Sequence, residues 1–324
     1  MKWATRALRN EFIDFWRKYP IESVMAGGPK DSLHYYVYDD GLSWDLLELD
    51  SKGIPLYIGR LFGRTYNPSY IAWYGLAKLQ DYLRGTNAEG QTIFLSQVQW
   101  LKTNYHKTPD GMIVWPFLID WKEGPIILKA PWPSVIAQGQ AISALVRGFR
   151  ITGDLELLEI CKGAAKAFRK NIDEGGVRAF AEGHVFHTEY PGHPAPRILD
   201  GFLSGLLGLY DLHVETNDPE VLESLKEGID GLKHLLPYWT YRNKWTWYGS
   251  RTHLGSSQYH TLHCRLLESL TRVCNDPVLN IYLKRWDFTK HSILSRCEIF
   301  FVFLFTKNLC RARHQTWRQK AAPS

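Results

Sequence analysis

Acidic, basic and phenolic residues gather in the long segments that connect the predicted helices of this chain. These segments contain Glu189 and Tyr190, then Tyr248 and Arg251, and finally Tyr259 at the start of a helix. A carboxyl group and a phenol can carry protons, and a guanidinium can bind a carboxylate through two hydrogen bonds. If the segments meet at one rim of the fold, they could form one acid–base site. Each residue also has an ordinary explanation, because loop tyrosines usually pack.

Two H-x-x-H spacings occur, at His184 and His187 and at His260 and His263. On a helix, side chains three residues apart share a face and could ligate zinc. Neither spacing has the H-E-x-x-H form or a predictable acidic third ligand, so no metal site is expected. The chain also lacks a dinucleotide-binding glycine motif, a phosphate-binding loop and a G-x-S-x-G turn. Nucleotide chemistry and serine hydrolysis therefore lose their usual support.

Helical periodicity begins near Pro68, and the helices that it predicts must position these segments. Apolar residues recur at helical spacing in 142–149 and 199–210. Turn residues followed by N-cap residues interrupt the helices about every 60 residues, at 85–87, 152–154, 216–219 and 275–277. The spacing predicts a mainly α fold of about four helical hairpins closed into an α/α barrel (toroid). Function is expected in the connecting segments 105–133, 174–197 and 237–257.

The regions that flank this predicted barrel, 68–287, differ from it in composition. Residues 1–67 combine a charged amphipathic helix over Met1–Tyr19 with strand-like stretches at 32–38 and 53–61, which predict a short β-hairpin region. Residues 288–324 contain an apolar run followed by arginines and a lysine. This extension is either an added helix that docks on the barrel or a poorly ordered tail.

The composition of the 324 residues is that of a globular protein. Hydrophobic residues make up 45% and charged residues 22%, which excludes disordered and fibrous classes. The net charge of +6 favours an acidic partner without deciding between nucleic acid, membrane and anionic sugar. The 13 Trp, 17 Tyr and 15 Phe exceed the usual need of a core, and they indicate clefts that stack sugar rings or other flat ligands.

Cysteine usage and the distribution of charge indicate a compartment. Five cysteines form no C-x-x-C pair, and their odd number argues against a complete disulfide framework, so reduced thiols are expected. Charged residues interrupt the N-terminal helix, unlike the apolar run of a signal peptide. The longest apolar run, Ile299–Phe305, is far shorter than the ~20 residues of a membrane span. A cytoplasmic protein without a membrane span is therefore expected.

Several ordered segments within residues 53–287 resemble the C-terminal catalytic domain of the D-glucuronyl C5-epimerases. This family converts glucuronate to iduronate within heparan-type polysaccharides, and its catalytic domain is an α/α barrel. The matching segments are Gly53-Ile54-Pro55-Leu56, Tyr74-Gly75-Leu76, Trp115-Pro116, the helix from Ala137-Gln138-Gly139-Gln140 to Arg147, Glu189-Tyr190-Pro191, Leu199-Asp200-Gly201-Phe202, Gly208-Leu209-Tyr210-Asp211-Leu212, Tyr248 with Arg251, Tyr259-His260-Thr261 with His263, and Lys284-Arg285-Trp286.

The resemblance implies a cofactor-free epimerase acting on a heparosan-like or heparan-like anionic polysaccharide. It places Glu189 and Tyr259 as the proton carriers on opposite faces of the sugar ring, with Tyr248 and Tyr190 orienting the ring or serving as alternative carriers. Arg251 is expected to neutralise the charge that grows on the substrate carboxylate. The residues expected to assist in substrate binding are Asp200, Gln140, His260, Arg285, Trp286 and Trp132.

Two departures from the family pattern bear on the substrate. Pro133 stands where the family often has a tyrosine, and Asp200 stands where the family has an asparagine. A polysaccharide lyase remains an alternative, because β-elimination also starts with removal of the C5 proton. A non-catalytic protein that binds glucuronate polymers is the other alternative. Nucleic acid is not an expected partner, and a homodimer is an open alternative.

Overall fold

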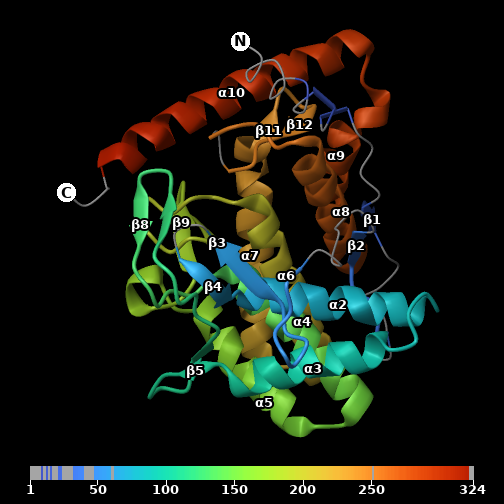
Figure 1. Ribbon diagram of the computed structural model, residues 1–324. Helices are drawn as coiled ribbons and strands as arrows, with labels where there is room; N and C mark the ends of the chain where they lie inside the picture. Colours follow the sequence, from blue (N-terminus) through green and yellow to red (C-terminus); the bar gives the residue numbers. More distant parts are fainter. Residues whose placement is uncertain are drawn as a thin grey trace.

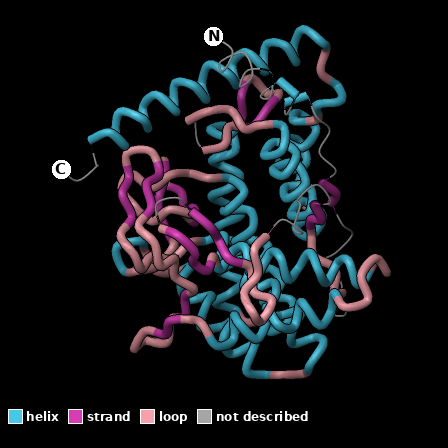
Figure 2. The backbone as a smooth tube through the Cα atoms, viewed as in Figure 1, coloured by secondary structure: helices cyan, strands magenta, loops and turns pink. Residues whose placement is uncertain are grey.

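A computed structural model describes residues 21–23, 32–39, 47–59, 62–249 and 252–320, together with Arg9, Phe12, Ile13, Phe15 and Trp16. The described chain is mainly helical, and its strands form small two-stranded antiparallel sheets (Figure 2). Four helical hairpins make up the centre of the molecule. Their helices are α2 (Pro68–Leu83) with α3 (Gly90–Thr103), α4 (Val135–Thr152) with α5 (Leu155–Ala165), α6 (Leu199–Thr216) with α7 (Pro219–Leu235), and α8 (Ser257–Cys274) with α9 (Pro277–Trp286).

The turns inside the hairpins form where the sequence predicts them. The side chains of Asp154, Asp218 and Asp276 accept hydrogen bonds from the first turns of α5, α7 and α9. Gly153 ends α4 with φ +73°, a left-handed conformation that glycine adopts without steric cost. Each hairpin thus has a turn of few residues, which keeps its two helices antiparallel and in contact.

The two central helices, α4 and α6, touch backbone to backbone. A Cβ atom on Gly139 would lie 2.4 Å from the carbonyl oxygen of Ser204, and one on Gly208 would lie 2.4 Å from the carbonyl oxygen of Gly139. Because neither helix could accommodate a side chain at these positions, the glycines set the distance between the helices. Residue 139 of α4 opposes 204–208 of α6, and Arg147 opposes Asp211 further along, so the two helices run parallel.

A buried ion pair joins the same helices near their carboxyl ends. Arg147 Nη1 donates to Asp211 Oδ2 at 2.7 Å, and both side chains are almost fully buried. The hydroxyl of Tyr36 donates to Asp211 Oδ1 at 2.6 Å, and Arg147 Nη2 donates to the carbonyl of His34 at 2.8 Å. The charges are therefore satisfied by a segment from the N-terminal region, which closes this end of the helical core.

Strands β1 (Ile21–Ser23) and β2 (Val37–Asp39) pair antiparallel between the two ends of the row of hairpins. β2 contacts both α2 and α8. Gln80 of α2 donates to the carbonyl of Tyr35, and Ser269 of α8 donates to the carbonyl of Tyr36. The four hairpins therefore form a curved row bridged by a β-hairpin, and the closed α/α barrel expected from the sequence is not confirmed.

Five further hairpins occupy the segments between the helices. β3 (Leu56–Gly59) pairs with β4 (Gly63–Tyr66) before α2; β3 lies inside the strand-like stretch 53–61 that the sequence predicts, whereas β4 follows it. The other four lie in the long connections where function is expected. They are β5 (His106–Lys107) with β6 (Ile113–Val114), β7 (Trp121–Glu123) with β8 (Ile126–Leu128), β9 (Arg178–Ala181) with β10 (His184–His187), and β11 (Thr240–Tyr241) with β12 (Trp245–Thr246).

The C-terminal extension forms α10 (Ile293–Lys320), which runs across the top of the molecule, opposite α3 and α5 (Figure 1). Ile299, Phe300 and Phe303 of α10 pack with Phe15, Trp245 and Leu254 in a second apolar cluster. The extension is therefore a docked helix over its described residues. Most of the helix predicted for Met1–Tyr19 lies outside the described residues, and the division into 1–67, 68–287 and 288–324 remains a prediction.

The described helices include none that is both long enough and apolar enough to span a bilayer. α10 has the length, but polar and charged side chains interrupt its apolar run.

We expect Arg147→Ala to lower the free energy of unfolding by about 3–5 kcal/mol, because it leaves the Asp211 carboxylate buried without its cation. Arg169 is a matched control, since its side chain is 42% exposed and pairs with Glu220 and Glu223. Arg169→Ala should cost less than about 1 kcal/mol. Urea denaturation of both variants measures the difference, and equal losses would show that the buried pair does not stabilise the core.

Candidate active site

A cavity of about 540 Å³ opens at the amino ends of α2, α4, α6 and α8. Asn67 and Ser134, the N-caps of α2 and α4, line it together with Asp200 in the first turn of α6 and Tyr259 in that of α8. Helix amino ends carry partial positive charge, so four of them facing one cavity favour an anionic ligand. Six of the eleven side chains singled out in the sequence line it, namely Glu189, Tyr190, Asp200, Tyr248, Tyr259 and Trp132.

Glu189 lies in the loop between β10 and α6, and Thr188 holds this loop in place. The Thr188 hydroxyl shares its proton between the carbonyls of Tyr190 and Pro196, each 3.1 Å away, and the Thr188 carbonyl accepts from the Val135 amide at the start of α4. The Glu189 side chain lies against Gly201, where a Cβ atom would come within 2.7 Å of Oε2. Gly201 therefore provides the space that the carboxyl group occupies on the first turn of α6.

The environment of Glu189 favours its protonated form. Burial raises the pKa of Glu189 well above its ordinary value, and the nearby Asp200 carboxylate raises it further. Within the described chain, Oε2 of Glu189 is buried without a hydrogen-bond partner, and the same holds for Oδ1 of Asp200 and Oγ of Ser134. Polar atoms in this state are normally satisfied by a ligand or by water, so the cavity suits a ligand rich in hydroxyl groups.

Three phenols surround the carboxyl groups. The rings of Tyr248 and Tyr259 meet edge to face with centroids 4.7 Å apart. Although Tyr259 as a residue is 38% exposed, burial is the largest cause that raises its pKa, and Asp200 and Glu189 raise it further. Burial likewise raises the pKa values of Tyr190 and Tyr248. The phenols are therefore neutral at physiological pH and can donate protons or hydrogen bonds.

Aromatic side chains form the remaining wall of the cavity. Trp132 stacks on Phe117 with ring centroids 4.4 Å apart, and its Nε1 donates to the carbonyl of Ile119. Trp132 also lies beside Tyr190, and the centroids of their rings are 6.0 Å apart. Flat apolar faces beside hydroxyl-binding groups are the usual surroundings of a bound sugar ring.

Four of the expected substrate-binding residues lie outside the cavity lining. Gln140 is buried and accepts from the Ser69 hydroxyl at 2.7 Å, so it positions a residue that does line the cavity. His260 and Trp286 are buried behind the wall, where His260 stacks on Trp245 at 3.6 Å and its Nε2 donates to the Trp286 carbonyl. Arg285 is exposed and stacks over Tyr282.

Arg251 lies outside the described residues, so its place as a carboxylate clamp stays a prediction. The described cavity lining contains no lysine, arginine or histidine. The described surroundings accordingly raise the pKa values of the cavity phenols, whereas a neighbouring cation would lower them.

Sequence reasoning missed several residues of the lining. Tyr57 of β3, Ser69 and Tyr70 of α2, and Trp121 and Glu123 of β7 all border the cavity. Burial raises the pKa of the Glu123 carboxyl group, which adds a third acidic group to this region. The richness of the 105–133 segment in tryptophan was a signal for Trp121. No such signal existed for Ser69 and Tyr70, because no spacing rule places the start of α2 beside the Glu189 loop, more than a hundred residues later.

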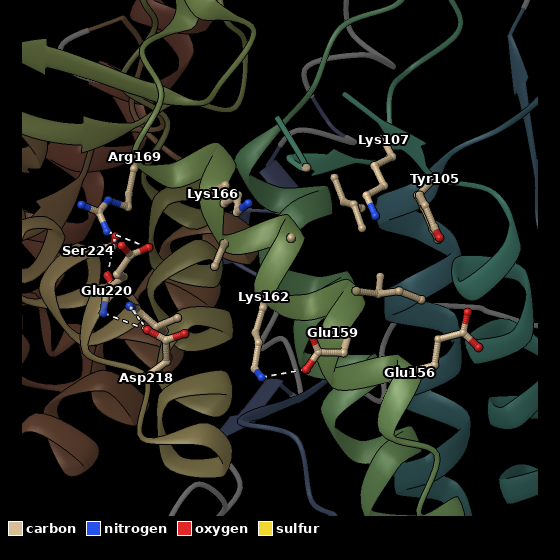
Figure 3. A pocket seen from close by; sticks show the side chains of 16 residues that line it. Tyr105, Lys107, Glu156, Glu159, Lys162, Lys166, Arg169, Asp218, Glu220 and Ser224 are labelled. Atoms are coloured by element: carbon tan, nitrogen blue, oxygen red, sulfur yellow. Dashed lines mark hydrogen bonds and ion pairs between the residues drawn. The ribbon is translucent and has the colours of Figure 1, made fainter. Parts of the chain in front are cut away.

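A second groove, of about 480 Å³, lies on the outer side of the helices between α5 and the start of α7. Figure 3 shows that charged side chains line it, including the ion pair between Lys162 and Glu159. None of the eleven residues singled out in the sequence borders this groove. Its acids and bases pair with one another at the surface, as on an ordinary solvated face.

The H-x-x-H spacings do not form the zinc sites that their pattern would allow. His187 is buried, with Nε2 donating to the Phe168 carbonyl at 3.2 Å. His184 instead stacks on His234 of α7 at 3.9 Å, and potential ligand atoms of His184, Asp230 and His234 all lie within 4.8 Å of one another. Within the described part of the chain, this surface group could hold a metal ion, and it does not belong to the cavity.

We expect Glu189→Gln to gain stability relative to the wild type as the pH rises. The unfolded chain releases the Glu189 proton near pH 4.5, whereas the fold raises this pKa. The stability that this group contributes is therefore complete below the unfolded pKa and is lost as the pH rises toward the folded one. Urea midpoints at about pH 5 and about pH 8 measure the effect. The exposed Glu223 supplies the control Glu223→Gln, and an identical trend in both variants would contradict the assignment.

Comparisons with known proteins agree with the geometry. A family model described as the D-glucuronyl C5-epimerase C-terminus matches residues 109–288, more than half of the chain. A D-glucuronyl C5-epimerase of Caenorhabditis elegans is 30% identical over 211 residues, which are 60% of this chain and 34% of that protein. An uncharacterised protein of Methanocaldococcus jannaschii is 25% identical over 179 residues, which are 54% of this chain and 57% of that protein.

The chain thus spans about a third of the length of the first relative and little more than half of the second. The matched region begins just before β6 and ends just after α9, so it contains α4, α6 and α8, three of the four helices whose amino ends border the cavity. The chain belongs to the D-glucuronyl C5-epimerase family and carries the C-terminal region of that family.

Proposed function

We propose that this protein is a C5-epimerase that converts D-glucuronate to L-iduronate, reversibly, within a heparosan-type or heparan-type polysaccharide. The observation that carries the proposal is the meeting of Glu189 and Tyr259 in one cavity with Tyr190 and Tyr248. Epimerisation at C5 needs one group that removes a proton and another that returns a proton to the opposite face. A carboxyl group and a neutral phenol bordering one cavity supply such a couple.

Glu189 acts as the base in this proposal, and Tyr259 acts as the acid. The ionised Glu189 takes the proton from C5, and Tyr259 donates its hydroxyl proton to the other face of the resulting enediolate. The raised pKa of Glu189 makes its carboxylate a stronger base than an exposed one, at the cost of a smaller ionised fraction. The raised pKa of Tyr259 keeps its proton available until the enediolate forms.

The amino ends of α2, α4, α6 and α8 stabilise the negative charge that develops on the substrate. Their aligned dipoles stabilise an anion at this position, and the first turns of α4 and α6 have no side-chain cap that accepts from their backbone N–H groups. Arg251 would add a guanidinium in the role of carboxylate clamp. Trp132 and Tyr190 would stack on the sugar, and Asp200 would accept hydrogen bonds from its hydroxyl groups.

The test is proton NMR of heparosan-type polymer incubated with the protein in deuterated water. An epimerase incorporates deuterium at C5 and produces iduronate without shortening the chain. A lyase would cut the polymer and leave an unsaturated end that absorbs ultraviolet light. A binding protein without activity would retain the polymer and incorporate no deuterium, and either of these two results would overturn the proposal.

Tyr259→Phe should separate exchange from epimerisation. Removing the phenolic proton should slow inversion at C5 by about 10²-fold or more, because the opposite face loses its donor. Glu189 remains, so deuterium should still enter C5 with retention of configuration. Tyr82 is a matched control, since this residue is 40% exposed and lies at the far end of α2. Inversion at the wild-type rate in Tyr259→Phe would remove this residue from the mechanism.

Glu189→Gln should abolish both reactions for the epimer whose C5 proton faces residue 189. An amide has the size of the carboxyl group but cannot accept the proton, and a loss of about 10²–10⁴-fold is expected. The NMR assay measures exchange and inversion together, with Glu223→Gln as the control. Undiminished deuterium incorporation from both epimers would show that another group, such as Glu123, is the base.

A further inference from the structure

The amino ends of the four helices that border the cavity are not equivalent. At α2 and α8 the N-cap side chains, those of Asn67 and Ser256, accept hydrogen bonds from backbone amides of the first turn. At α6 the carboxyl group of Glu189 lies against Gly201 of the first turn, and Asp200 adds a second acidic group there. These three amino ends are therefore already occupied by a cap or by acidic groups of the chain itself.

The amino end of α4 has neither kind of occupant. Ser134 is its N-cap residue, yet the Ser134 side chain makes no cap hydrogen bond, and the first turn contains no acidic residue. The amide of Val135 donates to the Thr188 carbonyl at 3.2 Å. No described residue accepts from the next two amides, those of Ile136 and Ala137, to which an N-cap side chain normally binds. Two N–H groups thus lack an acceptor at this end.

The Ser134 side chain is a second, independent indication of a ligand at this place. The residue is 1% exposed and borders the cavity. Its Oγ is buried and has no hydrogen-bond partner within the described part of the chain. Ser143, further along the same helix, also has an unpartnered hydroxyl but lies outside the cavity lining. Ser134 differs because its O–H donor borders the cavity beside two N–H donors of the same turn.

We propose that the amino end of α4 binds the carboxylate of the uronate, with the Ser134 hydroxyl and the amides of Ile136 and Ala137 as hydrogen-bond donors. This inference rests on the proposed epimerase function, and it adds the place at which the carboxylate is held. A carboxylate accepts several hydrogen bonds, and its charge is attracted by the partial positive charge of a helix amino end. The described lining contains no lysine, arginine or histidine, so neutral donors and helix dipoles bind the anion in this part of the cavity.

The position suits the reaction because the carboxyl carbon of a uronate is bonded directly to C5. The Val135 amide joins the start of α4 to the carbonyl of Thr188, the residue before Glu189. A carboxylate held at α4 therefore brings C5 to the loop that carries the base. When Glu189 removes the C5 proton, the electron pair of that bond forms a C5–C6 double bond and adds charge to the carboxylate oxygens. The donors at α4 then bind the enediolate more strongly than the substrate.

Backbone amide NMR tests the inference without turnover. The probes are methyl β-D-glucuronide and methyl β-D-glucoside, which differ only by a carboxylate in place of a hydroxymethyl group. We expect the glucuronide to shift the amide proton resonances of Ile136 and Ala137 downfield, because these protons acquire a charged acceptor. The glucoside should leave both resonances in place. Equal shifts with the two sugars, or no shift with the glucuronide, would overturn the inference.

Ser134→Ala should weaken binding of the glucuronide by about 10-fold or more, because a hydrogen bond to a charged group is lost. The melting temperature should not fall, since the hydroxyl has no partner in the described chain. Ser143→Ala is the matched control, because it removes an unpartnered hydroxyl from the same helix outside the cavity lining. The amide titration measures affinity, and native affinity in Ser134→Ala, or equal weakening in both variants, would contradict the inference.

Ser134→Asp fills the site with a group of the chain itself. The new carboxylate can accept from the amides of Ile136 and Ala137, as aspartate caps do at α5, α7 and α9. The melting temperature should therefore stay at or above the native value. The glucuronide should no longer shift the two amides, because their donors are occupied and a like charge repels the sugar. A folded Ser134→Asp protein with native affinity for the glucuronide would also overturn the inference.

These measurements separate the inference from the proposed function. If the glucuronide shifts the two amides of the native protein but heparosan-type polymer shows no C5 exchange, the carboxylate site stands and the proposed function fails. If exchange occurs and Ser134→Ala keeps the native rate and affinity, the function stands and the inference fails.

Discussion

A buried ion pair and a pair of glycines fix the position of α4 relative to α6, and the cavity depends on that placement. Arg147 and Asp211 join the helices near their carboxyl ends, while Gly139 and Gly208 allow backbone contact nearer their amino ends. Contacts at both ends leave little freedom to slide or tilt. The N-cap Ser134 and the first-turn residue Asp200 are held at the cavity as a consequence.

The ion pair also explains why the N-terminal region belongs to the helical core. Asp211 and Arg147 bury charges whose remaining hydrogen-bonding capacity is met by Tyr36 and by the His34 carbonyl. Buried charges without these partners would cost several kcal/mol. The segment 32–39 therefore packs between α2 and α8, where it supplies these partners and completes the core. A short β-hairpin thus bridges the ends of the row of hairpins.

The chemistry of the cavity follows from burial more than from neighbouring charge. Burial is the largest cause of the raised pKa of Glu189 and of the cavity phenols. A carboxyl group or phenol whose pKa is shifted by burial is suited to acid–base catalysis. Because the fold raises the pKa of Glu189, the protein also loses stability as the pH rises toward that pKa. The family to which the chain belongs is named for epimerisation at C5, and the described lining contains carboxyl groups and phenols whose pKa values are raised.

The sequence by itself determined the helical hairpins and their turns, because helical periodicity, aspartate caps and proline at the first helical position are local signals. It also indicated loops that border the cavity, since Glu189 and Tyr248 lie in the predicted segments 174–197 and 237–257. Only the tertiary structure decided that β2 bridges α2 and α8, that Tyr57 and Glu123 join the cavity, and that His260 and Trp286 lie behind its wall. These outcomes depend on contacts between residues far apart in the chain, because a side chain becomes buried only once those contacts form.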